Sequence, residues 1–319
     1  MAEISHRALR ELILGFPAPP PAPVEYFTEM ISAGALLGGG PFESWYQDAG
    51  PCPERVVYQL MGGDPAQLER AAALLDGRDC LGIDINMGCA APAIRRIGAG
   101  VAWMADIGRA GELMGRVRGA VRHKRLSVKL RIGFSDDFDY LARFCRCLEA
   151  EGVELITLHP RTAGEKFKRR PRWEYVGALR KELGIPVAGN GDIAGVAELL
   201  RRGAEGPVMT GRLAVRRPWI FAEALASGDQ NPGGYRVDLE ETALRFLELL
   251  ARYQPPEFHL SRARRFFNYF CDNLTFAHYV KTLLNREQDL AGIARAWSAY
   301  FAAHPEERCY VSKEPASPL

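Results

Sequence analysis

One cysteine, Cys89, combines a reactive side chain with a turn-forming setting. It stands in the segment INMGCAAPAIRRIGAGVAWM (85–104), directly after a strand-like run and a glycine. A helix-like run follows, and a helix N-terminus favours the thiolate form. Because a thiol can hold and release a proton near neutral pH, we interpret Cys89 as a candidate proton donor. A small buried apolar side chain is the alternative, and we assign that role to the other six cysteines.

Paired cationic side chains end two further strand-like runs. Lys129 and Arg131 stand two residues apart and therefore share one face of a strand, and His159 and Arg161 do the same on the next strand. Burying a cation among the aliphatic side chains of a strand is unfavourable unless the cation has a partner. We therefore interpret these side chains as one convergent polar cluster, with surface ion pairs as the alternative.

The last two predicted strands end in the sequences NGD (190–192) and GR (211–212). Backbone amides and a helix N-terminus at such late strand ends commonly bind phosphate. Arg212 would add charge-assisted hydrogen bonds. The pattern predicts a cofactor with a terminal phosphate, for which flavin mononucleotide (FMN) is suitable. Ordinary strand-to-helix turns are the alternative.

A basic run, KFKRRPR (166–172), follows the strand that ends at Arg161. A basic loop at that end of the strand would lie over the same polar cluster. We interpret it as a contact for a polyanionic substrate, with Lys168, Arg169 and Arg170 as the substrate-binding residues. A solvated surface loop is the alternative.

The elements that must position these side chains alternate between strand and helix. Helix-like runs cover 2–16, 65–76, 106–122, 136–151, 173–183 and 195–202, and strand-like runs cover 24–31, 56–62, 81–88, 126–133, 154–162, 185–193 and 206–213. Polar strand ends, and the lack of G-x-G-x-x-G after the first strand, favour a TIM (β/α)8-type barrel over a doubly wound sheet. We count seven strands, so we expect a barrel that lacks its first strand.

The domain organisation follows from where the strand signal stops. We predict an FMN-binding barrel over 1–226, a linker over 227–234 (SGDQNPGG), and a helical domain over 235–319. Helical spacing covers 237–253, 260–271, 275–285 and 289–302, and we expect no strand there.

Composition excludes several classes of protein. The 319 residues are 25% charged with a net charge of +2, which is typical of a globular chain and not of a disordered or fibrous one. No apolar run has the length of a membrane helix, and no secretory signal opens the chain. The seven scattered cysteines lack metal-ligand spacing, so we expect no metal. We expect a cytoplasmic monomer with no membrane or protein partner.

The motifs together resemble the dihydrouridine synthase family, flavoenzymes that reduce uridines in transfer RNA. The matching stretches occur in the family's order, and they are YFTEM (26–30), QLMGGDP (59–65), DINMGC (84–89), GAGVAWM (98–104), VKLRIG (128–133), TLHPRT (157–162), AGNGDI (188–193) and MTGRLAVRRPWIF (209–221).

The resemblance implies an oxidoreductase that takes FMN as cofactor, NADPH or NADH as reductant, and tRNA as substrate. It implies that Cys89 gives a proton to the uracil ring, with Asn86 and Arg161 at the substrate base. It implies an RNA-binding role for the helical domain. The FMN-binding residues that it implies are Met1, Ala2, Gln59, Lys129, His159, Asn190, Gly191, Asp192, Gly211 and Arg212.

Two departures from the family pattern concern the site. Ala90 and Ala91 separate Cys89 from Pro92, where the family usually has proline directly after the cysteine. The family also begins with a strand that ends in Ala-Pro-Met-Ala, of which this sequence has only Met1 and Ala2. We therefore expect the chain as given to bind FMN weakly.

Two other functions remain open at this stage. One is an FMN barrel that acts on a small enone-like metabolite, which would need neither a basic rim nor a helical domain. The other is a catalytically idle RNA-binding relative, which would purify without flavin. A continuous positive surface and the flavin content discriminate among the three.

Overall fold

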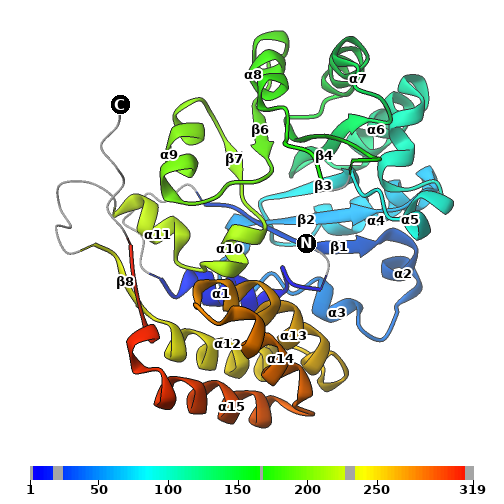
Figure 1. The fold of residues 1–319 in the computed structure, drawn as a ribbon. Coiled ribbons are helices and arrows are strands. Elements are labelled where there is room, and N and C mark those ends of the chain that lie inside the picture. The colour runs from blue at the N-terminus through cyan, green and yellow to red at the C-terminus, as the bar shows by residue number, and fades with distance from the viewer. Residues whose placement is uncertain (1–2, 17–23, 166–167, 227–233, 313–319) are drawn as a thin grey trace. The chain divides into compact units, whose positions relative to one another are not determined.

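The computed structural model describes residues 3–16, 24–165, 168–226 and 234–312 (Figure 1). The chain divides into two compact units. The larger comprises Glu25–Ile193 and Arg201–Thr210, and the smaller comprises Met1–Val24, Ala194–Leu200 and Gly211–Leu319. The predicted linker, apart from Gly234, lies outside the described residues, so the predicted domain boundaries stay a prediction.

The larger unit is built on a curled sheet of seven parallel strands in the order β1 to β7 (Figure 1). Strands that pair in chain order indicate barrel winding, whereas a doubly wound sheet would reverse its order partway. The predicted TIM-type fold is therefore confirmed, with the predicted number of strands. Their bounds are β1 (Tyr26–Ser32), β2 (Val56–Met61), β3 (Gly82–Met87), β4 (Arg125–Gly133), β5 (Leu155–Thr162), β6 (Val187–Asn190) and β7 (Val208–Met209).

Alternation along the strands separates an apolar face from a polar one. In β4, Leu126, Val128 and Leu130 alternate with polar side chains and are fully buried. The surrounding helices cover this aliphatic face. They are α4 (Pro65–Asp76), α6 (Ile107–Ala120), α7 (Phe138–Ala150) and α8 (Trp173–Glu182).

Three of these helices begin at an aspartate. The carboxylates of Asp64, Asp106 and Asp137 accept hydrogen bonds from backbone N–H groups in the first turns of α4, α6 and α7. Such a cap satisfies donors that have no partner inside the helix, and it contributes about 1 kcal/mol. Each cap fixes the residue at which the helix begins. It therefore also fixes the length of the connection between the preceding strand and that helix.

Short elements that the sequence analysis did not predict fill the connections. They are α2 (Ala33–Gly38), α3 (Glu43–Tyr46), η1 (Pro53–Arg55), α5 (Pro92–Arg96) and η2 (Gly100–Ala105). The helix α9 (Val196–Ala204) contributes residues to both units.

The smaller unit is mainly helical. Its helices are α1 (Arg7–Leu14), α10 (Arg212–Arg216), α11 (Ile220–Leu225), α12 (Leu239–Tyr253), α13 (His259–Phe270), α14 (Ala277–Arg286) and α15 (Leu290–Ala303), with short turns η3 (Pro256–Phe258), η4 (Cys271–Asn273) and η5 (Pro305–Glu307). Aromatic rings form its core: the Phe266 ring lies 3.8 Å from that of Phe246 and 4.8 Å from that of Phe270.

One expectation about this unit is wrong. Strands β8 (Arg236–Asp238) and β9 (Cys309–Val311) form an antiparallel pair, although no strand was expected after the linker. Each strand has three residues, too few to show a period of two. Among the described helices, none is both long and apolar enough to cross a bilayer.

A buried imidazole lies in the smaller unit. His6 is 2% exposed, its ring lies 6.0 Å from that of Phe246, and neither ring nitrogen has a hydrogen-bond partner among the described residues. Burial lowers the pKa of His6 well below 6.5, and the charges of Arg262 and Arg10 lower it further. Folding therefore favours the neutral form of this imidazole.

We predict that this imidazole makes the fold sensitive to acid. Below pH 6.5 the unfolded chain takes up a proton at His6 that the folded chain does not. Stability is therefore lost as the pH falls from 6.5 towards the lowered folded-state pKa, by about 1.4 kcal/mol per pH unit. His6→Phe should flatten this dependence in urea unfolding between pH 5 and 7. His278 is exposed, so His278→Phe is the control and should leave the pH dependence of stability unchanged. If the free energy of unfolding fell equally with pH in wild type and in His6→Phe, the prediction would be contradicted.

Candidate functional site

Polar side chains line one face of the curled sheet, from β2 to β6. Strand pairing sets Asn86 beside Lys129 and Lys129 beside Thr157, and sets Arg131 beside His159. Lys129 and Arg131 therefore share the face with His159 and Arg161, as the spacing predicted. The whole set is Gln59, Asp84, Asn86, Ser127, Lys129, Arg131, Thr157, His159, Arg161 and Asn190.

One fully buried member of this face is Asp84, which carries a carboxylate. It accepts hydrogen bonds from Gln59 Nε2 (2.7 Å) and from Ser127 Oγ (2.7 Å). Burial raises the pKa of Asp84 to about 6, and the two hydrogen bonds oppose that rise. Sequence reasoning missed Asp84, although its alternation with Asn86 on a strand was the available signal.

Asn86 connects this network to the loop that carries Cys89. Its Nδ2 donates to Gln59 Oε1 (3.0 Å), and its Oδ1 accepts from the backbone N–H groups of Gly88 (3.2 Å) and Cys89 (2.9 Å). The Asn86 side chain thus holds the backbone of the candidate proton donor. The predicted contact of Asn86 with a substrate base stays a prediction.

Cys89 is a partly exposed residue just beyond the carboxyl end of β3. Its carbonyl accepts from the backbone N–H of Val101 (3.0 Å). Gly100 has φ +60°, and a Cβ there would stand 2.4 Å from the Cys89 oxygen, so only glycine fits. The chain after Cys89 forms the five-residue α5 and then η2, which is more broken than the expected helix-like run.

Lys129 is half-buried at the centre of the polar face. Its Nζ donates to Asn190 Oδ1 (3.1 Å), and Asn190 Nδ2 donates in turn to the Met209 carbonyl (2.9 Å). Burial lowers the pKa of Lys129 to about 8, and the negative charge of Asp84 opposes that shift. An ammonium has three donors, so Lys129 can hold an acceptor in addition to Asn190.

Arg161 is 1% exposed and forms the centre of a second network. Its Nη1 lies 3.1 Å from Asp192 Oδ1 and 3.1 Å from His159 Nε2, and its Nε donates to the Arg169 carbonyl. The structure therefore brings three predicted site residues together in an ion pair and hydrogen bonds among themselves. Their predicted contacts with cofactor and substrate stay predictions.

Arg131 links the two networks at the strand ends. Its guanidinium donates to the Gly88 carbonyl (2.9 Å) and to the Thr162 carbonyl (3.3 Å). Burial lowers the pKa of Arg131, and the charge of Arg161 lowers it further. Arg131 thus fixes the backbone just before Cys89.

The turn after β6 depends on glycine. Gly191 has φ +131°, and a Cβ there would stand 2.9 Å from His159 Cδ2. Asp192 follows with φ +49°, in the left-handed region that aspartate tolerates. The turn therefore places the Asp192 carboxylate on Arg161 and the Gly191 backbone against the imidazole.

The basic loop is clamped at its base. Glu165 accepts two hydrogen bonds from Arg172 (2.7 and 2.9 Å) and one from the backbone of Thr162 (2.8 Å), and Arg172 also pairs with Asp136 (2.8 Å). These bonds lower the pKa of Glu165 to about 2, and the hydrogen bond from Arg172 has the largest effect. The sequence pattern does not distinguish Arg172 from the other basic residues of the run. The predicted substrate-binding residues Lys168, Arg169 and Arg170 are exposed beyond this clamp.

Four predicted cofactor residues remain. Met1 and Ala2 lie outside the described residues. Gly211 and Arg212 stand at the start of α10, in the smaller unit. Their predicted contacts with FMN stay predictions.

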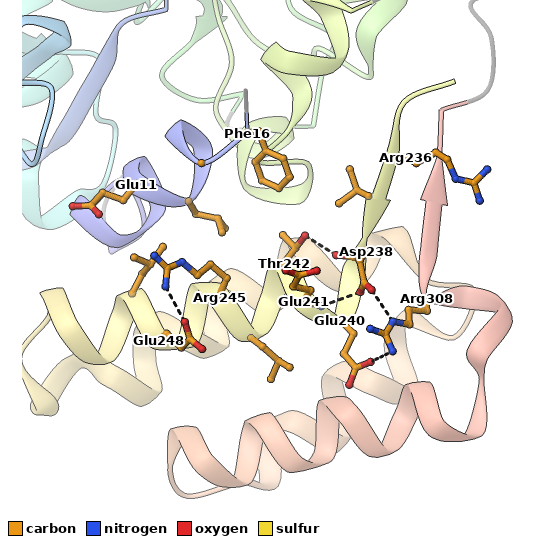
Figure 2. Close-up of a pocket in the computed structure, with 15 residues that line it drawn as sticks. Glu11, Phe16, Arg236, Asp238, Glu240, Glu241, Thr242, Arg245, Glu248 and Arg308 are labelled. Atoms are coloured by element: carbon orange, nitrogen blue, oxygen red, sulfur yellow. Dashed lines mark hydrogen bonds and ion pairs between the residues drawn. The ribbon is translucent and has the colours of Figure 1, made fainter. Parts of the chain in front are cut away.

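A cavity of about 760 Å³ lies in the smaller unit, between α1, α12 and β8 (Figure 2). Several of its charged side chains pair with one another: Arg308 bridges Asp238 (2.7 Å) and Glu240 (2.9 Å), and Arg245 pairs with Glu248 (2.9 Å). We assign this cavity no function.

Comparison with known proteins points to one family. The family described as "Dihydrouridine synthase (Dus)" matches residues 1–299. The tRNA-dihydrouridine synthase B of Pseudomonas aeruginosa is 28% identical over 250 residues, 76% of this chain and 75% of that protein. The enzyme of the same name from Xanthomonas axonopodis is 32% identical over 215 residues, 64% of each chain. A probable tRNA-dihydrouridine synthase of Rhizobium leguminosarum is 30% identical over 254 residues, 77% of this chain and 76% of that protein.

The glycine turn gives a direct test of the site's geometry. Gly191→Ala should destabilise the protein by about 1–3 kcal/mol, because a positive φ and a close approach to His159 both oppose a Cβ. Urea unfolding measures the loss. Gly164→Ala is the control, since a Cβ at Gly164 meets no atom within 4 Å. Equal effects of the two substitutions would show that the turn does not require glycine.

Proposed function

Because the chain belongs to the dihydrouridine synthase family, we propose that it is an FMN-dependent tRNA-dihydrouridine synthase. It would reduce the carbon 5–carbon 6 double bond of a tRNA uridine, with NADPH or NADH as the reductant. The observation that carries the proposal is the polar sheet face, on which Asn86 holds the backbone of Cys89 beside the cations Lys129 and Arg131.

The residues of this face fit a flavin. The ammonium of Lys129 and the amide groups of Gln59 and Asn190 complement the carbonyl and ring nitrogen atoms of a flavin. The Thr157 hydroxyl, next to Lys129 in the strand register, is buried without a hydrogen-bond partner in the part of the chain that the structure describes. When bound, reduced FMN would supply a hydride. The residues that we propose to hold it are Met1, Ala2, Gln59, Lys129, His159, Asn190, Gly191, Asp192, Gly211 and Arg212.

Cys89 is the acid in the proposed reaction. The carbon 5–carbon 6 bond of uracil is conjugated with the carbon 4 carbonyl, so reduction at carbon 6 develops negative charge on carbon 5 and oxygen 4. The thiol of Cys89 delivers a proton to carbon 5. Lys129 and His159 offset the developing charge from fixed positions on the sheet.

The target uridine has to swing out of the folded tRNA to reach this face. A uridine stacked in tRNA must be extruded before a group on the enzyme can reach carbon 5. The exposed residues Lys168, Arg169 and Arg170 would bind the phosphates beside it, while Asn86 and Arg161 would face the base. The ion pair of Glu165 with Arg172 fixes these two residues at the base of the loop, and order that exists before binding reduces the entropy lost on binding.

Replacing the proposed acid tests the chemistry. Cys89→Ala should slow uridine reduction by at least about 100-fold, since general acid catalysis contributes roughly that much or more. Flavin content and flavin reduction by NADPH should not change. Mass spectrometry of dihydrouridine in incubated tRNA measures the effect, with the partly buried Cys147→Ala as the control. Wild-type turnover in Cys89→Ala would assign the acid to another group.

Removing the charge of the basic loop tests RNA binding. Neutralising Lys168, Arg169 and Arg170 should reduce the slope of log K against log salt by about 2 to 3, since each phosphate contact releases a counterion. NADPH oxidation without RNA should be unchanged.

A second triple variant provides the matched control for that experiment. Arg78, Arg122 and Lys181 are exposed and precede β3, β4 and β6, so they stand at the opposite ends of the strands. Neutralising them removes the same charge and should leave the slope nearly unchanged. Equal slopes for the two triple variants would mean that the basic loop does not contact RNA.

A further inference from the structure

The carboxylate of Asp84 has no part in the proposed chemistry, yet it begins a chain of hydrogen bonds that ends at Cys89. The chain runs from Asp84 Oδ2 to Gln59 Nε2 (2.7 Å), from Gln59 Oε1 to Asn86 Nδ2 (3.0 Å), and from Asn86 Oδ1 to the Cys89 N–H (2.9 Å). Asp84, Gln59 and Asn86 are each less than a tenth exposed. Water therefore has little access to replace any of these partners.

The direction of every bond in this chain is set at its two ends. An ionised carboxylate only accepts, so Gln59 has to turn its NH2 group towards Asp84 and its oxygen towards Asn86. Asn86 then presents NH2 to Gln59 and oxygen to the loop. The backbone N–H groups of Gly88 and Cys89 only donate, and they require that same orientation of Asn86. Reversing the two amides would set acceptor against acceptor at Asp84 and donor against donor at the backbone N–H groups of Gly88 and Cys89.

We propose that Asp84 is a positioning residue: by fixing the orientation of the Gln59 and Asn86 amides, it holds the backbone of Cys89 and so the direction of the thiol. The catalytic meaning of this placement rests on the proposed function, but the placement itself can be measured on the purified protein without tRNA. The strand register supports the assignment, because Gln59 pairs with Asp84 across β2 and β3. Asp84, Gln59 and Asn86 are the three side chains that complete this series of hydrogen bonds to Cys89.

Ser127 offers a matched control for Asp84. Its hydroxyl donates to the other oxygen of Asp84 (2.7 Å), and it is equally buried. Its other contact is with the Ile83 carbonyl (3.5 Å), which leads away from Gln59. Ser127→Ala therefore removes a buried hydrogen bond from the same carboxylate without breaking the chain to Cys89.

The experiment measures how fast iodoacetamide alkylates Cys89, with peptide mass spectrometry to separate it from the other cysteines. Cys89 is only partly exposed, so we expect its alkylation to accelerate when its loop is held less firmly. Asp84→Leu should raise the rate about tenfold, the factor expected when roughly one ordinary hydrogen bond is lost. Asp84→Asn should restore a near wild-type rate, because its oxygen still accepts from Gln59 and its NH2 can donate to Ser127 Oγ. Ser127→Ala should also alkylate at the wild-type rate.

Two results would overturn the proposal. One is a wild-type alkylation rate in Asp84→Leu, and the other is an equal increase in Ser127→Ala, which would mean general loosening of the sheet. If Asp84→Leu does not fold, Gln59→Met breaks the chain one step later and should give the same increase. Deuterium exchange of the Gly88 and Cys89 amides should accelerate in the same variants.

The readouts keep the two proposals apart. If Cys89→Ala keeps wild-type turnover on tRNA while Asp84→Leu still accelerates alkylation, the proposed role of Cys89 in the reaction is wrong and the role of Asp84 stands. If Cys89→Ala is inactive and alkylation is insensitive to Asp84, the positioning role is wrong and the proposed function stands.

Discussion

The burial of several charges on one face of a parallel sheet is the constraint on which the larger unit depends. Lys129, Arg131 and Arg161 stand on neighbouring strands, where an unpaired cation would cost several kcal/mol. Each has an oxygen partner at a strand end or in a loop: the Asn190 amide, the Gly88 carbonyl and the Asp192 carboxylate respectively. The described residues at this end of the sheet therefore supply the oxygen partners that these three cations require.

This arrangement connects local backbone geometry with the chemistry that we propose. The Gly88–Cys89 turn is held from one side by Arg131 and from the other by Asn86, so its position depends on side chains of two different strands. The turn at Gly191 is held likewise, by its positive φ and by the contacts of Asp192 with Arg161. A rigid sheet thus determines the placement of groups that are carried by irregular chain.

The sequence was sufficient to predict the strands, because β-branched runs with polar ends repeat between amphipathic helices. It also predicted that Lys129 shares a face with Arg131, since alternation is a local property. It could not predict the ion pair of Arg161 with Asp192, because that contact depends on how far β5 and β6 are offset from each other. The short strands β8 and β9 were missed for a different reason, since three residues carry no detectable period.

The pairing of Arg161 has a thermodynamic consequence for any anion that approaches it. Its guanidinium already contacts Asp192, His159 and the Arg169 carbonyl. A ligand that binds there exchanges one set of hydrogen bonds for another, so the net gain is the difference between two similar energies. Simple anions therefore gain little, and only a ligand that makes further contacts elsewhere on the sheet face can displace the carboxylate. Selectivity at this position comes from competition within the protein itself.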